Sequence, residues 1–292
     1  MQKKDETYFE ESTLSESKVA ILAVIPFLVV VILFEILPLL MVIVRSFLPQ
    51  GQAGFTLQHY IDAFSKKLYR DAIWNSIQIS VLSSVLGMVI AFFGAKVAHS
   101  ATEKTRNMFM SILNMTSNFA GIPLAFSFII LLGNVGVLVI LGKLFGLEWL
   151  ANFNLYSHQG LLLIYVYFQV PLATLLLIPA FDGLRKEWRE SVCLLGGTDL
   201  CYWVKVGIPN LLPSVLGTIS MLLANAFAAY ATAYALLAGN YSLLPIRISE
   251  QFVGDVVQRK EFGSALAVIL MLLMVATTAF SNMISKRLQK RG

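Results

Sequence analysis

The chain has 292 residues, of which 57% are hydrophobic and only 13% are charged. Charged residues make up about 25% of an ordinary soluble domain, so this composition excludes a soluble globular protein and indicates a membrane protein. The net charge of +5 resides mainly in the loops and the C-terminal tail, and it gives little support to a nucleic-acid-binding protein.

The first eighteen residues carry five acidic residues against three lysines, unlike the basic start of a cleavable signal peptide. The apolar run that follows is also too long for one. We therefore expect residues 1–18 to form a cytoplasmic tail and the first apolar segment to remain as a membrane anchor.

Six apolar stretches are long enough to cross a hydrocarbon core, which takes about 20 helical residues. They cover approximately residues 19–45, 72–97, 107–132, 159–181, 214–239 and 262–284. Glycines interrupt the stretch 133–150, which we interpret as an external loop with a short surface helix. The sequence therefore predicts an all-α, polytopic membrane protein with about six transmembrane helices, a transmembrane domain over residues 19–285 and a basic cytoplasmic tail at 286–292.

Small residues recur on one face of the second stretch. They are Ser76, Ser80, Ser83, Gly87 and Ala91. Small side chains let helices approach closely in a membrane, so we expect this face to pack against another helix.

Lysine and arginine determine the expected orientation, since cytoplasmic loops carry an excess of both. With both termini in the cytoplasm, the inner segments hold 14 of the 22 lysines and arginines. This orientation places the loop at residues 182–213 inside the cell as well.

Residues 182–213 form a polar loop between two apolar stretches. Charged and apolar residues alternate at helical spacing from Trp188 to Leu195, which predicts a short amphipathic helix. Its apolar side comprises Leu184, Trp188, Val192 and Leu195, and its charged side Arg185, Arg189 and Glu190.

A glycine pair, Gly196 and Gly197, follows this helix. Glycine adopts the left-handed turn that ends a helix without steric cost, so we expect the helix to stop there. Thr198 or Asp199 is expected to cap a second short helix, and Pro209 to mark the return to the membrane. Two short helices joined at a tight elbow form a knob that can seat in a groove on another protein.

The spacing in this loop resembles a known motif. Glu190, followed six residues later by Gly196 and then by Ile208-Pro209, resembles the EAA loop in permease subunits of binding-protein-dependent (type I) ABC importers. Ser191 and Val192 stand where that loop usually has two alanines.

Two further segments resemble the polyamine (spermidine/putrescine)-type permeases of this class. One runs from Phe55 to Phe64 and continues at Trp74-Asn75-Ser76, and the other runs from Phe227 to Gly239 and continues at Leu243-Leu244-Pro245. Permeases that carry iron, phosphonates, opines or thiamine share the pattern, so these solutes stay open beside a polyamine or related organic cation.

The resemblance implies a multi-pass subunit of the bacterial inner membrane. Two permease subunits, alike or different, would enclose one pathway for a solute that an external binding protein delivers. Two separate ABC ATPase subunits would bind ATP and magnesium, while this chain would bind no cofactor and catalyse no reaction. The residues expected to couple to the ATPase are Arg185, Trp188, Arg189, Glu190, Val192, Leu195, Gly196, Gly197, Thr198, Asp199 and Pro209.

Several polar and aromatic residues at membrane depth are candidates for lining the pathway, since buried polar groups need a cavity or a partner. They are Asn118, Tyr165, Gln169, Asn225, Tyr230 and Tyr234. The alternative is that they fill gaps between helices and bond to one another. Glu35 lies in the first apolar run, roughly 24 Å from its start at 1.5 Å per residue, and we expect it near the outer interface.

Neither a nucleotide site nor a metal site is evident in the sequence. The segment from Gly136 to Leu144 has five residues between its glycines where a phosphate-binding loop has four, and it ends in leucine instead of serine or threonine. The three histidines are dispersed, and metal-binding pairs such as His-Glu-x-x-His or Cys-x-x-Cys are missing from the sequence. A secondary transporter and an intramembrane enzyme remain as less favoured alternatives.

Overall fold

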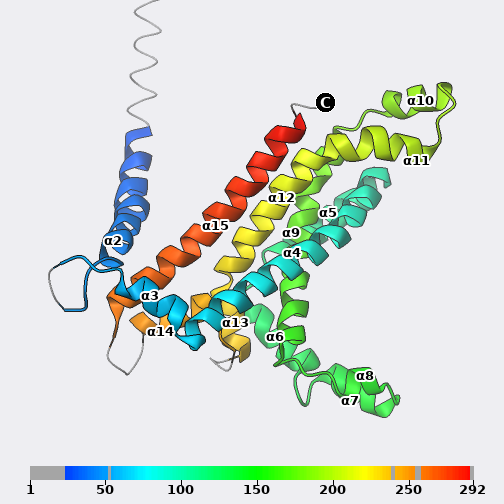
Figure 1. Cartoon of the computed structure of the whole chain (residues 1–292). Helices are drawn as coiled ribbons and strands as arrows, with labels where there is room; N and C mark the ends of the chain where they lie inside the picture. Colours follow the sequence, from blue (N-terminus) through cyan, green and yellow to red (C-terminus); the bar gives the residue numbers. More distant parts are fainter. Residues whose placement is uncertain (1–23, 52–53, 238–240, 254–257, 290–292) are drawn as a thin grey trace, which may run out of the picture.

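The computed structural model of the chain describes residues 24–51, 54–237, 241–253 and 258–289 (Figure 1). Over these residues the regular elements are all helices. The expected tail at residues 1–18, Gly239 and the last three residues lie outside the described residues.

Six helical segments are long and apolar enough to cross a membrane, which confirms the prediction of about six. They are Val24–Arg45, Lys67–Ser100, Ile122–Leu144, His158–Asp182, Asp199–Ala228 and Lys260–Arg287. The protein is therefore a multi-pass, all-α membrane protein.

Two of the predicted spans are not continuous helices. The stretch 107–132 consists of α5 (Glu103–Ser117) and α6 (Ile122–Leu132), separated by a break, and 214–239 contains the end of α12 (Ile208–Ala228) and α13 (Tyr230–Leu237). The stretch 133–150, expected as an external loop with one short helix, holds two, α7 (Val137–Leu144) and α8 (Glu148–Ala151), and α7 belongs to the membrane-length segment Ile122–Leu144. Both breaks fall inside stretches that hydropathy alone reads as continuous.

Helix α4 (Lys67–Ser100) packs most extensively against α9 (His158–Asp182). The small residues predicted to form a packing face, from Ser76 to Ala91, are all buried. A Cβ atom on Gly87 would lie 3.1 Å from the Cβ of Gln169, so the two helices meet where a larger residue would not fit. Small side chains thus permit this close approach, as the sequence predicted.

The remaining helices surround this pair. Helices α12 and α15 (Lys260–Gln289) pack together, while α3 (Gln58–Ser65) and α14 (Leu244–Phe252) contact α15 near its start. Helices α10 (Lys186–Leu194) and α11 (Asp199–Tyr202) project at the end of the bundle that also holds the C-terminus (Figure 1).

The first helix, Val24–Arg45, stands beside the bundle, and none of its residues is buried. It comprises a π-helical turn, η1 (Ile32–Ile36), followed by α2 (Leu37–Arg45), with Pro38 supplying no backbone N–H just after the turn. Glu35 lies in η1, about 15 Å before the end of the helix at Arg45 at 1.5 Å per residue. Its expected place near the outer interface stays a prediction.

Candidate functional site

The predicted elbow is formed by α10, α11 and the turn between them. Gly196 has φ +77°, in the left-handed region. The Gly197 N–H donates to the Val192 carbonyl at 2.9 Å and the Gly196 N–H to the Cys193 carbonyl at 3.0 Å. This pair of bonds is a Schellman motif, which ends α10 where the glycine pair predicted.

Side chains complete the second half of the elbow. The Thr198 hydroxyl accepts from the Cys201 N–H, so Thr198 is the N-cap of α11. Asp199 instead accepts two hydrogen bonds from Arg189, at 2.9 Å from Nε and 2.7 Å from Nη2. The hydrogen bond to Asp199 raises the pKa of Arg189. The bidentate pair links α10 to α11 across the turn.

The tip of the elbow exposes a leucine cluster. Leu194, Leu195 and Leu200 are 89%, 88% and 73% exposed. The sequence placed Leu195 on the apolar side of the helix with Leu184, which is buried, but Leu195 follows the last helical residue and remains uncovered. These leucines give the elbow an apolar surface that faces no other described part of the chain.

The elbow continues without interruption into a membrane helix. A π-helical turn, η2 (Trp203–Gly207), joins α11 to α12, and the Ile208 N–H donates to the Trp203 carbonyl. Pro209 follows and has no N–H to offer the Lys205 carbonyl, which accounts for a widened turn at this point. The second half of the elbow thus belongs to the same continuous helical segment as α12, Asp199–Ala228.

Polar contacts join the ends of α4, α5 and α9 at the end of the bundle that holds the elbow. Asp182, at the end of α9, accepts hydrogen bonds from both Nη atoms of Arg106 on α5. His99 Nδ1 on α4 lies 3.0 Å from Oδ1 of the same carboxylate. Three helices therefore meet at one carboxylate beside the base of the elbow.

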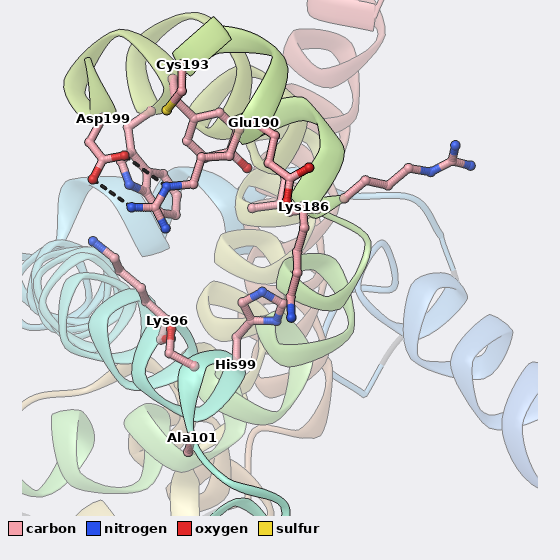
Figure 2. A pocket seen from close by; sticks show the side chains of 13 residues that line it. Lys96, His99, Ala101, Lys186, Glu190, Cys193 and Asp199 are labelled. Carbon is pink, nitrogen blue, oxygen red and sulfur yellow. Dashed lines mark hydrogen bonds and ion pairs between the residues drawn. The ribbon is translucent and has the colours of Figure 1, made fainter. Parts of the chain in front are cut away.

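A cavity of about 860 Å³ lies between the elbow and the end of α4 (Figure 2). Lys96 and His99 extend into it from α4, and Lys186 reaches from α10 toward His99. Its lining residues are Lys96, His99, Ser100, Ala101, Leu184, Arg185, Lys186, Arg189, Glu190, Cys193, Asp199, Tyr202 and Trp203.

A second site lies deep in the bundle, where the two helix breaks meet. The first break contains Gly121, with φ +74°, and the second contains Ala229, with φ −74° and ψ 67°. The Gly121 N–H donates to Oγ1 of Thr232 at 3.1 Å, and that hydroxyl lies 3.3 Å from the Gly121 carbonyl. The Tyr165 hydroxyl donates to the Ala229 carbonyl at 2.8 Å. Side chains thus bond to backbone groups at both breaks.

A cavity of about 320 Å³ opens at these breaks. Its lining residues are Ser117, Ala120, Gly121, Phe168, Leu172, Asn225, Ala228, Ala229, Tyr230, Ala231 and Thr232, none of which is charged. The Asn225 side chain is exposed and makes no hydrogen bond to any residue that the structure describes. Irregular backbone within a membrane bundle is tolerated where it lines such a space, which makes this cavity a candidate position for a solute contact.

The structure brings two of the six candidate pathway residues to this cavity, Asn225 and Tyr230. Tyr234 stacks on Tyr230, with ring centroids 5.3 Å apart, but is not part of the lining. Asn118 is exposed one residue beyond Ser117, and its Nδ2 donates to the Asn114 carbonyl at 2.8 Å.

The other two candidates, Tyr165 and Gln169, are fully buried between helices. Gln169 Nε2 donates to the hydroxyls of Ser83 at 2.7 Å and Ser84 at 3.3 Å, while its Oε1 has no partner among the described residues. Tyr165 and Gln169 thus fit the alternative to a pathway lining, in which polar groups bond to one another or to the backbone. Sequence reasoning also missed Ser117, Phe168 and Thr232. Gly121, two residues before Pro123 in the predicted span 107–132, was a usable signal for the break.

Comparison with known proteins gives relatives in one class. No protein-family model matches the chain. The thiamine transport system permease protein ThiP of Salmonella typhimurium is 27% identical over 232 residues, which cover 76% of this chain and 41% of the relative. The sulfate permease CysW of Synechocystis is 23% identical over 239 residues, covering 79% and 82%. The spermidine/putrescine permease PotB of Haemophilus influenzae is 23% identical over 252 residues, covering 83% and 86%. The chain thus spans about two fifths of the length of the thiamine permeases that it matches.

Solved structures agree on the fold. A bacterial ABC transporter that imports the acidic polysaccharide alginate superposes with a TM-score of 0.73 at 15% identity, covering 94% of this chain and 98% of that one. The MetNI methionine ABC transporter, in an inward-facing form, superposes with a TM-score of 0.53 at 16% identity, covering 76% and 95%.

The chain therefore has the fold of an ABC importer permease, and its relatives by sequence are permeases of that class. Those relatives carry thiamine, sulfate or spermidine and putrescine, so similarity alone does not single out one solute.

Proposed function

We propose that this chain is the transmembrane permease subunit of an ABC importer and forms part of the pathway for a small solute. The observation that carries the proposal is the elbow of α10 and α11. It projects from the bundle, exposes three leucines at its tip and continues into a membrane helix. An apolar helical knob of this kind suits a groove on a partner protein.

Two ABC ATPases, a second permease subunit and an extracytoplasmic binding protein are the partners in this proposal. One similar structure is an alginate transporter in complex with its periplasmic protein bound to an alginate pentasaccharide, which supports the binding-protein partner. ATP and magnesium bind to the ATPases, and this chain is not an enzyme. The residues proposed for coupling remain Arg185, Trp188, Arg189, Glu190, Val192, Leu195, Gly196, Gly197, Thr198, Asp199 and Pro209, within the loop 182–213.

The proposed location is the bacterial inner membrane, with both termini and the elbow in the cytoplasm. Arg106, Arg185, Lys186, Arg189 and Lys205 lie at the elbow's end of the bundle, where an excess of cations marks the cytoplasmic side. The C-terminus emerges at the same end (Figure 1).

We propose a polyamine or a related organic cation as the solute. PotB is among the relatives, and the stacked rings of Tyr230 and Tyr234 offer faces that attract a cation. Asn225, beside Tyr230, adds a free amide to the same cavity. The alternatives are iron, a phosphonate, an opine or thiamine, of which thiamine is supported by the ThiP relatives.

Copurification tests the class of protein. The chain should retain an ATP-hydrolysing subunit when purified in mild detergent, and uptake into vesicles should require that subunit, ATP and the binding protein. Uptake by the chain alone would instead show a secondary transporter and overturn the proposal. Binding assays on the associated binding protein, with spermidine, putrescine and thiamine as ligands, would decide the solute.

The native cysteines test the orientation. Cys193 and Cys201 are the two cysteines of the chain, and Cys193 is exposed in the elbow. A membrane-impermeant maleimide should label Cys193 in permeabilised cells but not in intact cells. Labelling in intact cells would place the elbow outside and rule out coupling to a cytoplasmic ATPase.

A further inference from the structure

The cavity beneath the elbow is rich in cations. Its lining includes Lys96, Arg185, Lys186 and Arg189 against the carboxylates of Glu190 and Asp199. Arg189 and Asp199 pair with each other, which leaves three cations facing one carboxylate. No carboxylate of a described residue forms an ion pair with Lys96, Arg185 or Lys186. The cavity therefore carries uncompensated positive charge.

These cations lie where the exposed apolar surface of α4 ends. On α4, Phe93 and Val97 are exposed apolar residues on either side of Lys96 in the sequence. Lys96 Nζ lies 4.6 Å from the ring centroid of Trp203, and tryptophan is enriched where a membrane meets water. The cavity thus lies at the end of the exposed apolar surface of α4, and the three exposed leucines of the elbow's tip are not among its lining residues.

Two elements contribute cations from opposite sides. Lys96 extends from α4, while Lys186 reaches down from α10 (Figure 2). Lysine binds phosphate as a point charge, and basic pockets between membrane helices on the cytoplasmic side receive the head groups of anionic lipids. The space of about 860 Å³ is large enough for such a group, and both lysines line it.

We propose that this cavity binds a phosphate group, which links the end of α4 to α10 through Lys96 and Lys186. The phosphate belongs to the head group of an anionic lipid or to a soluble phosphate compound of the cytoplasm. The cytoplasmic setting rests on the orientation given under the proposed function, whereas phosphate binding itself follows from the charge of the cavity. Occupancy would restrict movement of the elbow relative to α4 and so regulate coupling.

The test compares three double variants of the full-length chain, each purified with the partner subunits that it retains. Native mass spectrometry counts phosphatidylglycerol retained after extraction from nanodiscs of phosphatidylcholine with graded phosphatidylglycerol, and inorganic phosphate is titrated separately in detergent. Lys96→Gln with Lys186→Gln should weaken binding roughly 30-fold, at about 1 kcal/mol for each basic residue near a membrane surface. Lys104→Gln with Lys286→Gln, exposed lysines outside the cavity, should leave it unchanged.

Lys96→Arg with Lys186→Arg keeps the charge and should restore binding, which separates loss of charge from loss of folding. Selective retention of phosphatidylglycerol identifies a lipid as the source, and binding of inorganic phosphate without lipid preference identifies a soluble anion. Unchanged binding in the glutamine variant, or an equal loss in the control, overturns the proposal. ATPase copurification from the same wild-type preparation tests the proposed function separately. If the ATPase is not retained, the lipid bound to the chain can still be counted.

Discussion

Gly196 is the position where a single substitution tests the coupling elbow most directly. Its φ of +77° lies in the left-handed region, and a Cβ added there would meet no atom within 4 Å. A valine at this position is therefore strained by the backbone alone and not by a clash. Left-handed backbone costs a residue other than glycine roughly 1–2 kcal/mol, which corresponds to about a five- to thirty-fold loss of the correctly folded elbow.

We expect Gly196→Val to remain in the membrane but to bind its ATPase roughly tenfold more weakly, since the strain is confined to the elbow. Asparagine tolerates the left-handed region better, so Gly196→Asn should have a smaller effect. Affinity is measured by titrating the ATPase onto the permease in nanodiscs, alongside ATP hydrolysis stimulated by the binding protein.

Gly146 provides a matched control. It has φ +68°, also has no atom within 4 Å of a Cβ, and follows α7 in a turn closed by the Leu147 N–H on the Gly142 carbonyl. Gly146→Val should carry the same local strain without weakening ATPase binding. Wild-type affinity in Gly196→Val, or equal loss in Gly146→Val, would refute the link between the turn and coupling.

Three further substitutions address the bundle and the deep cavity. Tyr165→Phe removes the donor to the Ala229 carbonyl and should lower the free energy of unfolding in detergent by about 1 kcal/mol, measured by thermal denaturation; no change would mean that water replaces the hydroxyl. Gly87→Val should reduce the yield of monodisperse protein in size-exclusion chromatography because the valine side chain would meet Gln169. Gly217→Val should not reduce it, since a Cβ atom on Gly217 would have no neighbouring atom within 4 Å. Equal yields of the two variants would contradict the packing argument. Asn225→Leu should slow solute uptake while ATPase binding persists, and unchanged uptake would remove Asn225 from the pathway.

Local signals allowed the sequence to predict the elbow. The stop at Gly196 and Gly197 and the cap at Thr198 depend on bonds between residues only a few positions apart. The small-residue face of α4 was predictable for the same reason, because helical spacing alone places those residues together.

The helix breaks depend on contacts that are distant in the sequence. Gly121 is bonded by Thr232, 111 residues later, and the Ala229 carbonyl by Tyr165, 64 residues earlier. No local pattern reports such a pairing. For the same reason the sequence assigned Tyr165 and Gln169 to the pathway with Asn225 and Tyr230: a polar residue at membrane depth satisfies its bonding equally well on a neighbouring helix or in a cavity.

The helical rod from Asp199 to Ala228 has a mechanical consequence. Its 30 residues measure about 45 Å at 1.5 Å per residue, with one end in the elbow and the other at the break beside the deep cavity. A tilt of about 5° at the elbow would sweep the far end sideways by about 4 Å over that length. A small rotation of the elbow would thus displace the inner end of this rod by about the width of a methyl group, at the centre of the bundle.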